Sequence, residues 1–417
     1  MKLIKFKYYN HFDSNPGVFA GFIRNKIAPY WDEYNKNIFN NDYTNLKNDN
    51  NDLKFYEIAY DYSKKITDKL TLSTDIINLI NSKKMKLIIT SPGDALQMDF
   101  MFWVIEYINK FNLDSKQVIL VTSNLRGSET YKLLLEEFPS FKKYPMKHVG
   151  IDSFHYENFN NFFGKTDELV HLYPDTNKKL YKYLCYNGAA KEQRLFLVTE
   201  LFRRGLDKYG LISLLFRYGN TNQISDDFIK RLGFNHENWE LGKMIDEYAK
   251  LEMINKVPIV VDRDLESINE NDRHVNIQNI KDTYFSIVTE SYYYNTYLPI
   301  SHKKILCLTE KTWKAILYHP FIMLGGYGTL KYLKSLGFET FPELFDESYD
   351  DIEDHQLRLL SVINSIEKVC SMDEVKFHKI YCNEIIPKVI HNRELAISGK
   401  LKSHFSNNFF RELLNES

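Results

Sequence analysis

Six polar residues in the second half of the sequence stand where predicted strands end and predicted helices begin: Asn187, Arg194, Glu290, Thr309, Glu310 and Lys311. Asn187 and Glu290 each close a run rich in apolar and aromatic residues, which is typical of a buried strand. The carboxyl ends of parallel strands share one edge of a sheet, and ligands of open α/β sheets bind at that edge. A helix N-terminus with a lysine beside it favours phosphate. The pattern therefore predicts a site for a nucleoside diphosphate.

These residues have distinct expected roles. Arg194 lies in the first turn of one predicted helix, and Lys311 lies in the first turn of another, which Thr309 would cap. The two cations would neutralise a pyrophosphate, which gains negative charge when it departs. Glu310 or Glu290 would accept hydrogen bonds from ribose hydroxyls. The alternative is that Glu310 and Lys311 are exposed residues of a helix start with no ligand to bind. An acid at that place is stabilised by the helix dipole in any case.

Two further strand ends supply candidates. Gly325 and Gly326 follow the apolar run 321–324, and this fourth strand end favours a binding site over a mere helix start. In the first half of the chain, Asp94 follows the run 86–90, at a strand end that would open on the acceptor side. A carboxylate there could act as the general base. The alternative is a turn aspartate that follows Pro-Gly.

Asp262 and Asp264 form an Asp-x-Asp motif after the apolar run 257–261. Some glycosyltransferases hold a divalent metal with such a motif, because carboxylate oxygens suit hard cations. Three residues are a short match, and acidic residues after a strand more often begin a turn or cap a helix. We therefore predict no metal site and keep a metal-dependent reaction as an alternative.

The elements that would position these residues alternate between strands and helices. Strands are expected at 1–9, 86–90, 117–121, 181–187, 257–261, 285–289 and 321–324, and helices at 95–111, 128–137, 191–204 and 329–336. This alternation predicts an α/β protein with parallel sheets. A polar stretch that contains a proline, near 174–179, separates an N-terminal domain at 1–176 from a C-terminal domain at 177–350, and we expect a helical segment at 351–417 that packs back across both.

The composition excludes several classes of protein. A net charge of -1 and a pI near 6.9 give no global basic field for non-specific binding to nucleic acid. No apolar stretch is long enough to span a bilayer, so the sequence predicts a soluble, cytoplasmic protein. The four cysteines, Cys185, Cys307, Cys370 and Cys382, have no Cys-x-x-Cys spacing and are expected to be free thiols in a reducing compartment.

The order of four motifs resembles the donor-binding half of the alpha-1,3-fucosyltransferases. The motifs are Asn187-Gly-Ala with Arg194-Leu-Phe, Phe285-Ser-Ile-Val-Thr-Glu-Ser, Thr309-Glu-Lys-Thr-Trp-Lys-Ala, and Pro320-Phe-Ile with Gly325. The chain resembles still more closely the glycosyltransferase-like proteins of large tailed bacteriophages, through Gly328-Thr-Leu-Lys-Tyr-Leu and Gly337-Phe-Glu-Thr-Phe. The resemblance covers roughly residues 180 to 350. The N-terminal half resembles no family that we can name.

The resemblance implies a GT-B fold, in which two Rossmann-like domains face a cleft. It implies that the N-terminal domain lies on the acceptor side, that the C-terminal domain binds the nucleotide sugar, and that the chemistry is metal-independent. Carried over residue by residue, Arg194 and Lys311 bind the diphosphate, Glu310 binds the ribose, and Glu290 lies near the sugar as a catalytic carboxylate. Asn187, Thr309, Gly325 and Gly326 complete the expected donor site. The segment 292–305 is longer than in the fucosyltransferases, which leaves the sugar and the base of the donor open.

The sequence therefore predicts a glycosyltransferase that moves a sugar from a nucleoside-diphosphate sugar to a hydroxyl acceptor, with inversion and without a metal. A phage origin would make a glycan or a hydroxymethylated DNA base a reasonable acceptor. The near-neutral net charge of the protein does not by itself favour binding to DNA. The alternative is a non-catalytic nucleotide-binding or glycan-binding protein with the same fold. The catalytic base, the acceptor and the oligomeric state are left open.

Overall fold

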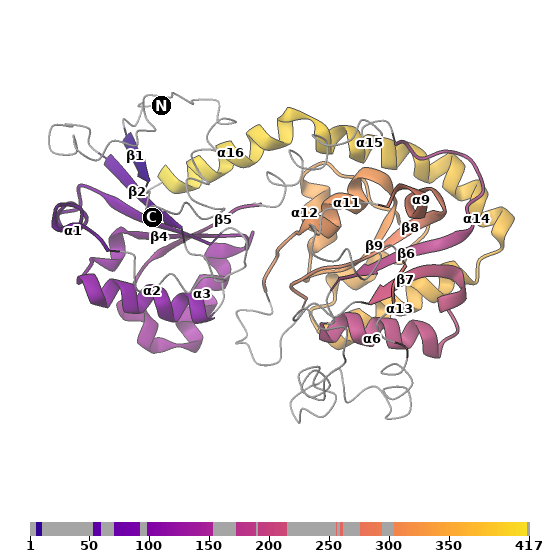
Figure 1. The fold of residues 1–417 in the computed structure, drawn as a ribbon, viewed down its shortest axis with the longest axis horizontal. Helices are drawn as coiled ribbons and strands as arrows, with labels where there is room; N and C mark the ends of the chain where they lie inside the picture. Colours follow the sequence, from indigo (N-terminus) through magenta and orange to yellow (C-terminus); the bar gives the residue numbers. More distant parts are fainter. Residues whose placement is uncertain are drawn as a thin grey trace. The chain divides into compact units, whose positions relative to one another are not determined.

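The computed structural model describes residues 6–10, 53–59, 71–91, 98–152, 172–188, 191–214, 256, 259–261, 276–293 and 304–414. The chain divides into two compact units. Unit 1 draws on residues 1–157, 298–307 and 399–417, and unit 2 draws on residues 158–297 and 308–398. Each unit contains one parallel sheet with helices packed against it, as Figure 1 shows. The predicted α/β class with two parallel sheets is confirmed.

Unit 1 contains a five-stranded sheet with the order β1-β2-β3-β4-β5. The strands are β1 (Phe6–Asn10), β2 (Leu53–Ala59), β3 (Lys86–Ser91), β4 (Val118–Thr122) and β5 (Lys147–Gly150). The helices are α1 (Thr74–Asn81), α2 (Met98–Phe111), α3 (Gly127–Glu137) and α16 (Gly399–Leu414), with 3-10 turns at Ser115–Gln117 and Pro139–Lys143. Each strand lies beside its predecessor, so right-handed crossovers all place their helices on one face. Figure 1 shows α2 and α3 together on that face.

The sheet of unit 1 is covered on both faces. The strand β4 reads Val-Ile-Leu-Val-Thr and is buried at every position, as expected of a central parallel strand. Its alternate residues Val118 and Leu120 pack into the core formed with α1, α2 and α3. On the other face, Lys147 Nζ of β5 donates to the main-chain carbonyl of Glu412 in α16. The last helix of the chain therefore belongs to the unit that is built from its beginning.

Unit 2 contains a four-stranded parallel sheet with the order β7-β6-β8-β9. The strands are β6 (Tyr181–Asn187), β7 (Gly210–Leu214), β8 (Thr283–Thr289) and β9 (Phe321–Leu324). The helices are α6 (Glu192–Arg203), α9 (Ile277–Lys281), α11 (Glu310–Tyr318), α12 (Thr329–Ser335), α13 (His355–Cys370), α14 (Glu374–Ile380) and α15 (Ile386–Ile397). A π-helical turn (Tyr381–Ile385) joins α14 to α15, and 3-10 turns lie at Asp207–Tyr209 and Glu347–Asp351.

The strand order of unit 2 creates a point where the connections diverge. From β6 the chain passes through α6 to β7 on one side, whereas from β8 it passes through α11 to β9 on the other side. Right-handed crossovers in opposite directions place the two helices on opposite faces of the sheet, as Figure 1 shows for α6 and α11. The carboxyl ends of β6 and β8 therefore form a topological switch point, where open α/β sheets bind their ligands.

Three predictions about chain organisation differ from the structure in detail. Of the predicted strand at 257–261, the structure describes residues 259–261, where Ile259 forms an isolated antiparallel bridge with Leu214. The predicted boundary near residue 176 falls inside unit 2, since the Tyr173 ring lies 4.7 Å from the Arg393 guanidinium of α15. The helical segment 351–417 is divided, because α13, α14 and α15 belong to unit 2 and α16 belongs to unit 1.

Candidate functional site

Asn187 joins three strands at the switch point of unit 2. Its side-chain carbonyl accepts a hydrogen bond from Thr289 Oγ1 of β8 at 2.7 Å, and its amide donates to the Ser213 carbonyl of β7 at 3.0 Å. Asn187 is fully buried. The side chain that the sequence predicts as a donor ligand therefore holds β7, β6 and β8 in register below the surface of the site.

Glu290 is a buried carboxylate that holds the start of α11. One carboxylate oxygen accepts from the Thr309 main-chain N–H at 3.0 Å and from the Thr312 hydroxyl. The other accepts from the Thr309 hydroxyl at 2.6 Å and from the Ser291 main-chain N–H at 3.1 Å. Thr309 is the predicted N-cap and accepts from the Lys311 N–H. The positive end of α11 thus already carries a negative charge, which the helix dipole favours.

Residues from the first turn of α6 fix the end of β8 from the other face. Gln193 Nε2 donates to the Glu290 carbonyl at 3.0 Å, and Arg194 Nη2 donates to the Thr289 carbonyl at 3.0 Å. Only 2% of the Arg194 surface is exposed. Arg194 therefore lies beneath the sheet edge with its guanidinium on the backbone, rather than at the surface where a pyrophosphate would bind.

Glu310 and Lys311 lie above this buried layer, where solvent can reach them. About a fifth of each side chain is exposed, at 22% for both, and the Lys311 ammonium forms an ion pair with the Glu310 carboxylate. Lys311 Nζ also lies 3.5 Å from Ser291 Oγ and 3.4 Å from Thr309 Oγ1. Burial acts to raise the pKa of Glu310, but the Lys311 ammonium outweighs it and holds that pKa below its ordinary value. The structure thus places a carboxylate and an ammonium group side by side at the end of β8.

Lys191 joins these residues, although the sequence analysis assigned it no role. Its Nζ donates to the Ser291 carbonyl at 2.9 Å and lies 5.4 Å from the centre of the Tyr292 ring. Lys191 is the N-cap residue of α6, and no side chain caps that helix. The sequence carried one signal for it: a lysine stands where a serine, threonine or aspartate is usual.

The glycines after β9 have a structural explanation. Gly325 and Gly326 are buried, and a Cβ on Gly325 would lie 3.0 Å from Thr329 Oγ1. The Asp350 carboxylate accepts from the main-chain N–H groups of Leu330 and Lys331, both at 2.9 Å. A buried acid therefore occupies the start of α12, as Glu290 occupies the start of α11. Lys331, in the first turn of α12, is exposed at this sheet edge, and Lys191, Arg194 and Lys311 come from the β6 and β8 connections.

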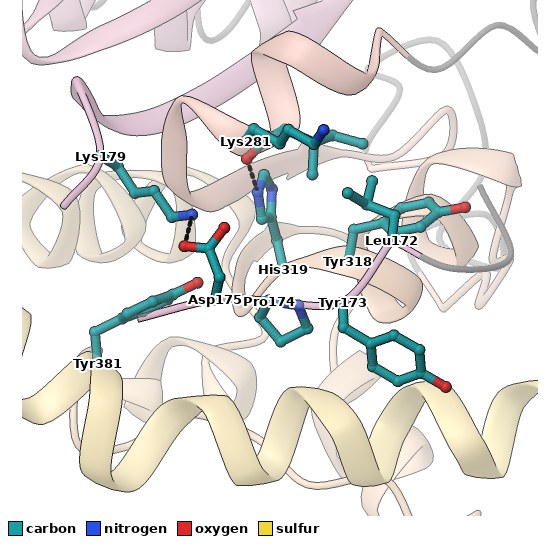
Figure 2. Close-up of a pocket in the computed structure, with 10 residues that line it drawn as sticks. Leu172, Tyr173, Pro174, Asp175, Lys179, Lys281, Tyr318, His319 and Tyr381 are labelled. Carbon is teal, nitrogen blue, oxygen red and sulfur yellow. Dashed lines mark hydrogen bonds and ion pairs between the residues drawn. The ribbon is translucent and has the colours of Figure 1, made fainter. Parts of the chain in front are cut away.

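A small pocket lies at the opposite, amino edge of the same sheet. Figure 2 shows His319 at its centre and the ion pair between Asp175 and Lys179, 2.7 Å long, at its side. His319 Nε2 donates to the Ile280 carbonyl at 2.9 Å, so Nδ1 accepts from the Ser286 hydroxyl. Burial lowers the pKa of His319 to about 4. The empty volume, about 270 Å³ with open solvent included, is below the usual range for a ligand of nucleotide size.

Several predicted residues lie outside the described part of the chain. Asp94, Asp262 and Asp264 are among them, so the structure does not place the proposed base or the Asp-x-Asp motif. Among the described residues, no group of three or more His, Cys, Asp and Glu side chains is arranged to hold a metal ion. In the same part of the chain, no helix has the length and apolar character needed to cross a membrane. All four cysteines are free thiols, and Cys382 alone is half-buried rather than buried.

Comparison with known proteins adds no assignment. No protein-family model matches the sequence, and a search of curated proteins found no match. The argument for function therefore rests on the residues at the switch point of unit 2.

Proposed function

We propose that the chain is a glycosyltransferase of the GT-B type, in which unit 2 binds a nucleoside-diphosphate sugar and unit 1 supplies the acceptor side. The observation that carries this proposal is the position of Glu310 and Lys311. They are partly exposed at the carboxyl end of β8, beside the switch point between β6 and β8. An ionised carboxylate suits ribose hydroxyls, and an ammonium suits a phosphate oxygen.

The buried layer explains how these groups could serve catalysis. When the bond between the sugar and the diphosphate breaks, negative charge develops on the leaving phosphate. A fixed ammonium stabilises that charge best when it need not reorganise. Glu290, Thr309 and Gln193 hold the end of β8 and the start of α11 in one network, so Lys311 projects from a rigid base. In this proposal Glu290 is a positioning residue, and Asp94 stays the predicted general base. The reaction proceeds without a metal.

One observation favours the second candidate, a nucleotide-binding protein without turnover. The Glu290 carboxylate accepts four hydrogen bonds from its own chain, which leaves it no geometry for accepting a proton from an acceptor hydroxyl. Catalysis would then depend on another carboxylate, such as the predicted base Asp94. A glycan or a hydroxymethylated DNA base is the proposed acceptor in the first case, and neither is required in the second.

The test is a thermal-shift screen of the full chain with nucleoside diphosphates and their sugar conjugates, followed by an assay of donor hydrolysis. A ligand at a hundredfold excess over its dissociation constant should stabilise the protein by about 2.7 kcal/mol. Lys311→Met should remove that shift, whereas Lys379→Met, at an exposed position in α14, should retain it. Binding with hydrolysis or transfer supports the enzyme. Binding without either supports the second candidate, and no binding contradicts both.

A further inference from the structure

The amino end of α6 begins with the sequence Lys191-Glu-Gln-Arg194. Lys191 is the N-cap residue, and its side chain makes no capping hydrogen bond to the helix. Its ammonium instead donates to the Ser291 carbonyl, just after the end of β8, at 2.9 Å. The N-cap lysine of α6 is therefore directed to the switch point of unit 2.

Lys191 and Lys311 reach the same residue from two different helices. Lys191 Nζ lies 2.9 Å from the Ser291 carbonyl oxygen, and Lys311 Nζ lies 3.5 Å from the Ser291 hydroxyl. Lys191 comes from the β6 connection and Lys311 from the β8 connection, so the two ammonium groups stand on either side of the switch point. Lys191 and Lys311 are both half-buried, so solvent and ligand can reach them. We call these two residues the lysine pair.

Arg194 cannot reach an anion beside Ser291 without breaking its hydrogen bond to the Thr289 carbonyl. Its guanidinium is buried and donates to the Thr289 carbonyl under the sheet edge, one strand residue before Glu290. The start of α11 is also occupied, since the Glu290 carboxylate accepts from the Thr309 main-chain N–H. Lys331, in the first turn of α12, is also exposed at this edge, but it follows β9 and not the β6–β8 switch point. The lysine pair is the accessible basic pair that the described residues place at Ser291.

We propose that the lysine pair binds the two phosphate groups of the donor, one ammonium from each side of Ser291, and that Arg194 is a positioning residue. The proposal rests on the proposed function and makes it specific. Lys191 takes the place that the sequence analysis gave to Arg194. The ligand is taken to be a diphosphate because the proposed donor is a nucleoside-diphosphate sugar. The Tyr292 ring beside Lys191 closes the same side of the site.

The experiment measures binding of inorganic pyrophosphate and of ADP, GDP, CDP and UDP to the full chain by titration calorimetry. Lys191→Met and Lys311→Met should each weaken binding of pyrophosphate, and of the diphosphate that binds best, by about 10-fold to 100-fold, as expected for a lost charge-assisted contact. Each should also reduce the dependence of affinity on salt, because one screened charge is removed. Lys379→Met is the matched control and should change neither quantity.

Arg194→Gln separates positioning from binding, because it removes the charge and keeps a hydrogen-bond donor for the Thr289 carbonyl. It should lower the melting temperature of the protein while leaving the salt dependence of diphosphate affinity unchanged. Wild-type affinity in Lys191→Met, together with weakened binding in Lys311→Met, would overturn the lysine pair and leave the proposed function standing. A reduced salt dependence in Arg194→Gln would also overturn it. Failure of the wild-type chain to bind any of the five probes would overturn the lysine pair and the proposed function together.

Discussion

Glu290→Gln is the substitution that tests the buried layer most directly. The change keeps the size of the side chain and replaces one acceptor oxygen with an NH₂ group. Each carboxylate oxygen of Glu290 accepts from one main-chain N–H and from one hydroxyl. A hydroxyl can turn and accept from the new NH₂ group, whereas a main-chain N–H cannot. Whichever way the amide is oriented, the N–H of either Ser291 or Thr309 loses its acceptor.

The magnitude follows from that count. A buried donor left without an acceptor costs about 1–3 kcal/mol. Loss of the negative charge at the start of α11 removes a further contribution of about 0.3–1 kcal/mol, or up to about 2 kcal/mol for a partly buried group. We expect Glu290→Gln to destabilise unit 2 by about 2–4 kcal/mol. Glu394→Gln, at an exposed position in α15, should stay within about 0.5 kcal/mol of the wild type.

The assay combines urea unfolding with hydrogen exchange read by mass spectrometry. Exchange should accelerate in peptides that contain Ser291 or Thr309, and it should stay unchanged in peptides from β4 of unit 1. Diphosphate binding should weaken as well, since Lys311 loses its rigid base. A variant with wild-type stability and exchange but no sugar transfer would refute this reasoning, because that result would make Glu290 a catalytic group rather than a positioning one.

Three further predictions concern the rest of the fold. Burial lowers the pKa of His148 and of His319 to about 4, so each histidine must stay neutral to remain buried. The free energy of unfolding should therefore be highest above pH 6.5 and should fall towards pH 4, by up to about 3 kcal/mol for each histidine. Urea midpoints that are constant between pH 7 and 4.5 would contradict this. Lys182→Met should cost about 1–3 kcal/mol in urea unfolding, because Lys182 Nζ donates to three carbonyls at the end of α13, at 2.8 to 3.1 Å; a change below 0.5 kcal/mol, roughly that of a surface substitution, would show that water replaces the cap. Arg393→Met should lower stability by about 1–3 kcal/mol, since the guanidinium donates to the last turn of α11 and lies 5.3 Å from the Tyr318 ring, and Arg393→Lys should restore only part of it by the same measurement.

The parts of the site that depend on neighbouring residues in the sequence, such as helix caps and strand ends, were predictable. Thr309 is the N-cap of α11, as the sequence predicts, because a threonine before a helical run can accept from the first turn whatever surrounds it. Glu310 and Lys311 lie beside that cap for the same reason. The strands at 181–187 and 321–324 have the predicted bounds, since their apolar runs end at polar or glycine residues.

The depth of each side chain was not predictable in this way. Arg194 and Lys191 are three residues apart in one helix start, yet the arginine is buried and the lysine reaches the surface. Arg194 is buried because its guanidinium donates to the Thr289 carbonyl at the end of β8, a strand from a distant part of the chain. A charge pattern read along one helix cannot reveal this partner.

The α/β class, most strand and helix positions in the described residues, and the residue types at strand ends follow from local sequence patterns. That β6 and β8 are neighbours, and that their connections diverge, emerges from the folded chain. The folded chain also decides that Glu290 holds α11 across 19 residues and that Lys191 meets Ser291 across 100 residues. The physical reason is range: caps and periodicity act within a few residues, whereas strand order and burial are set by contacts between segments far apart in the chain.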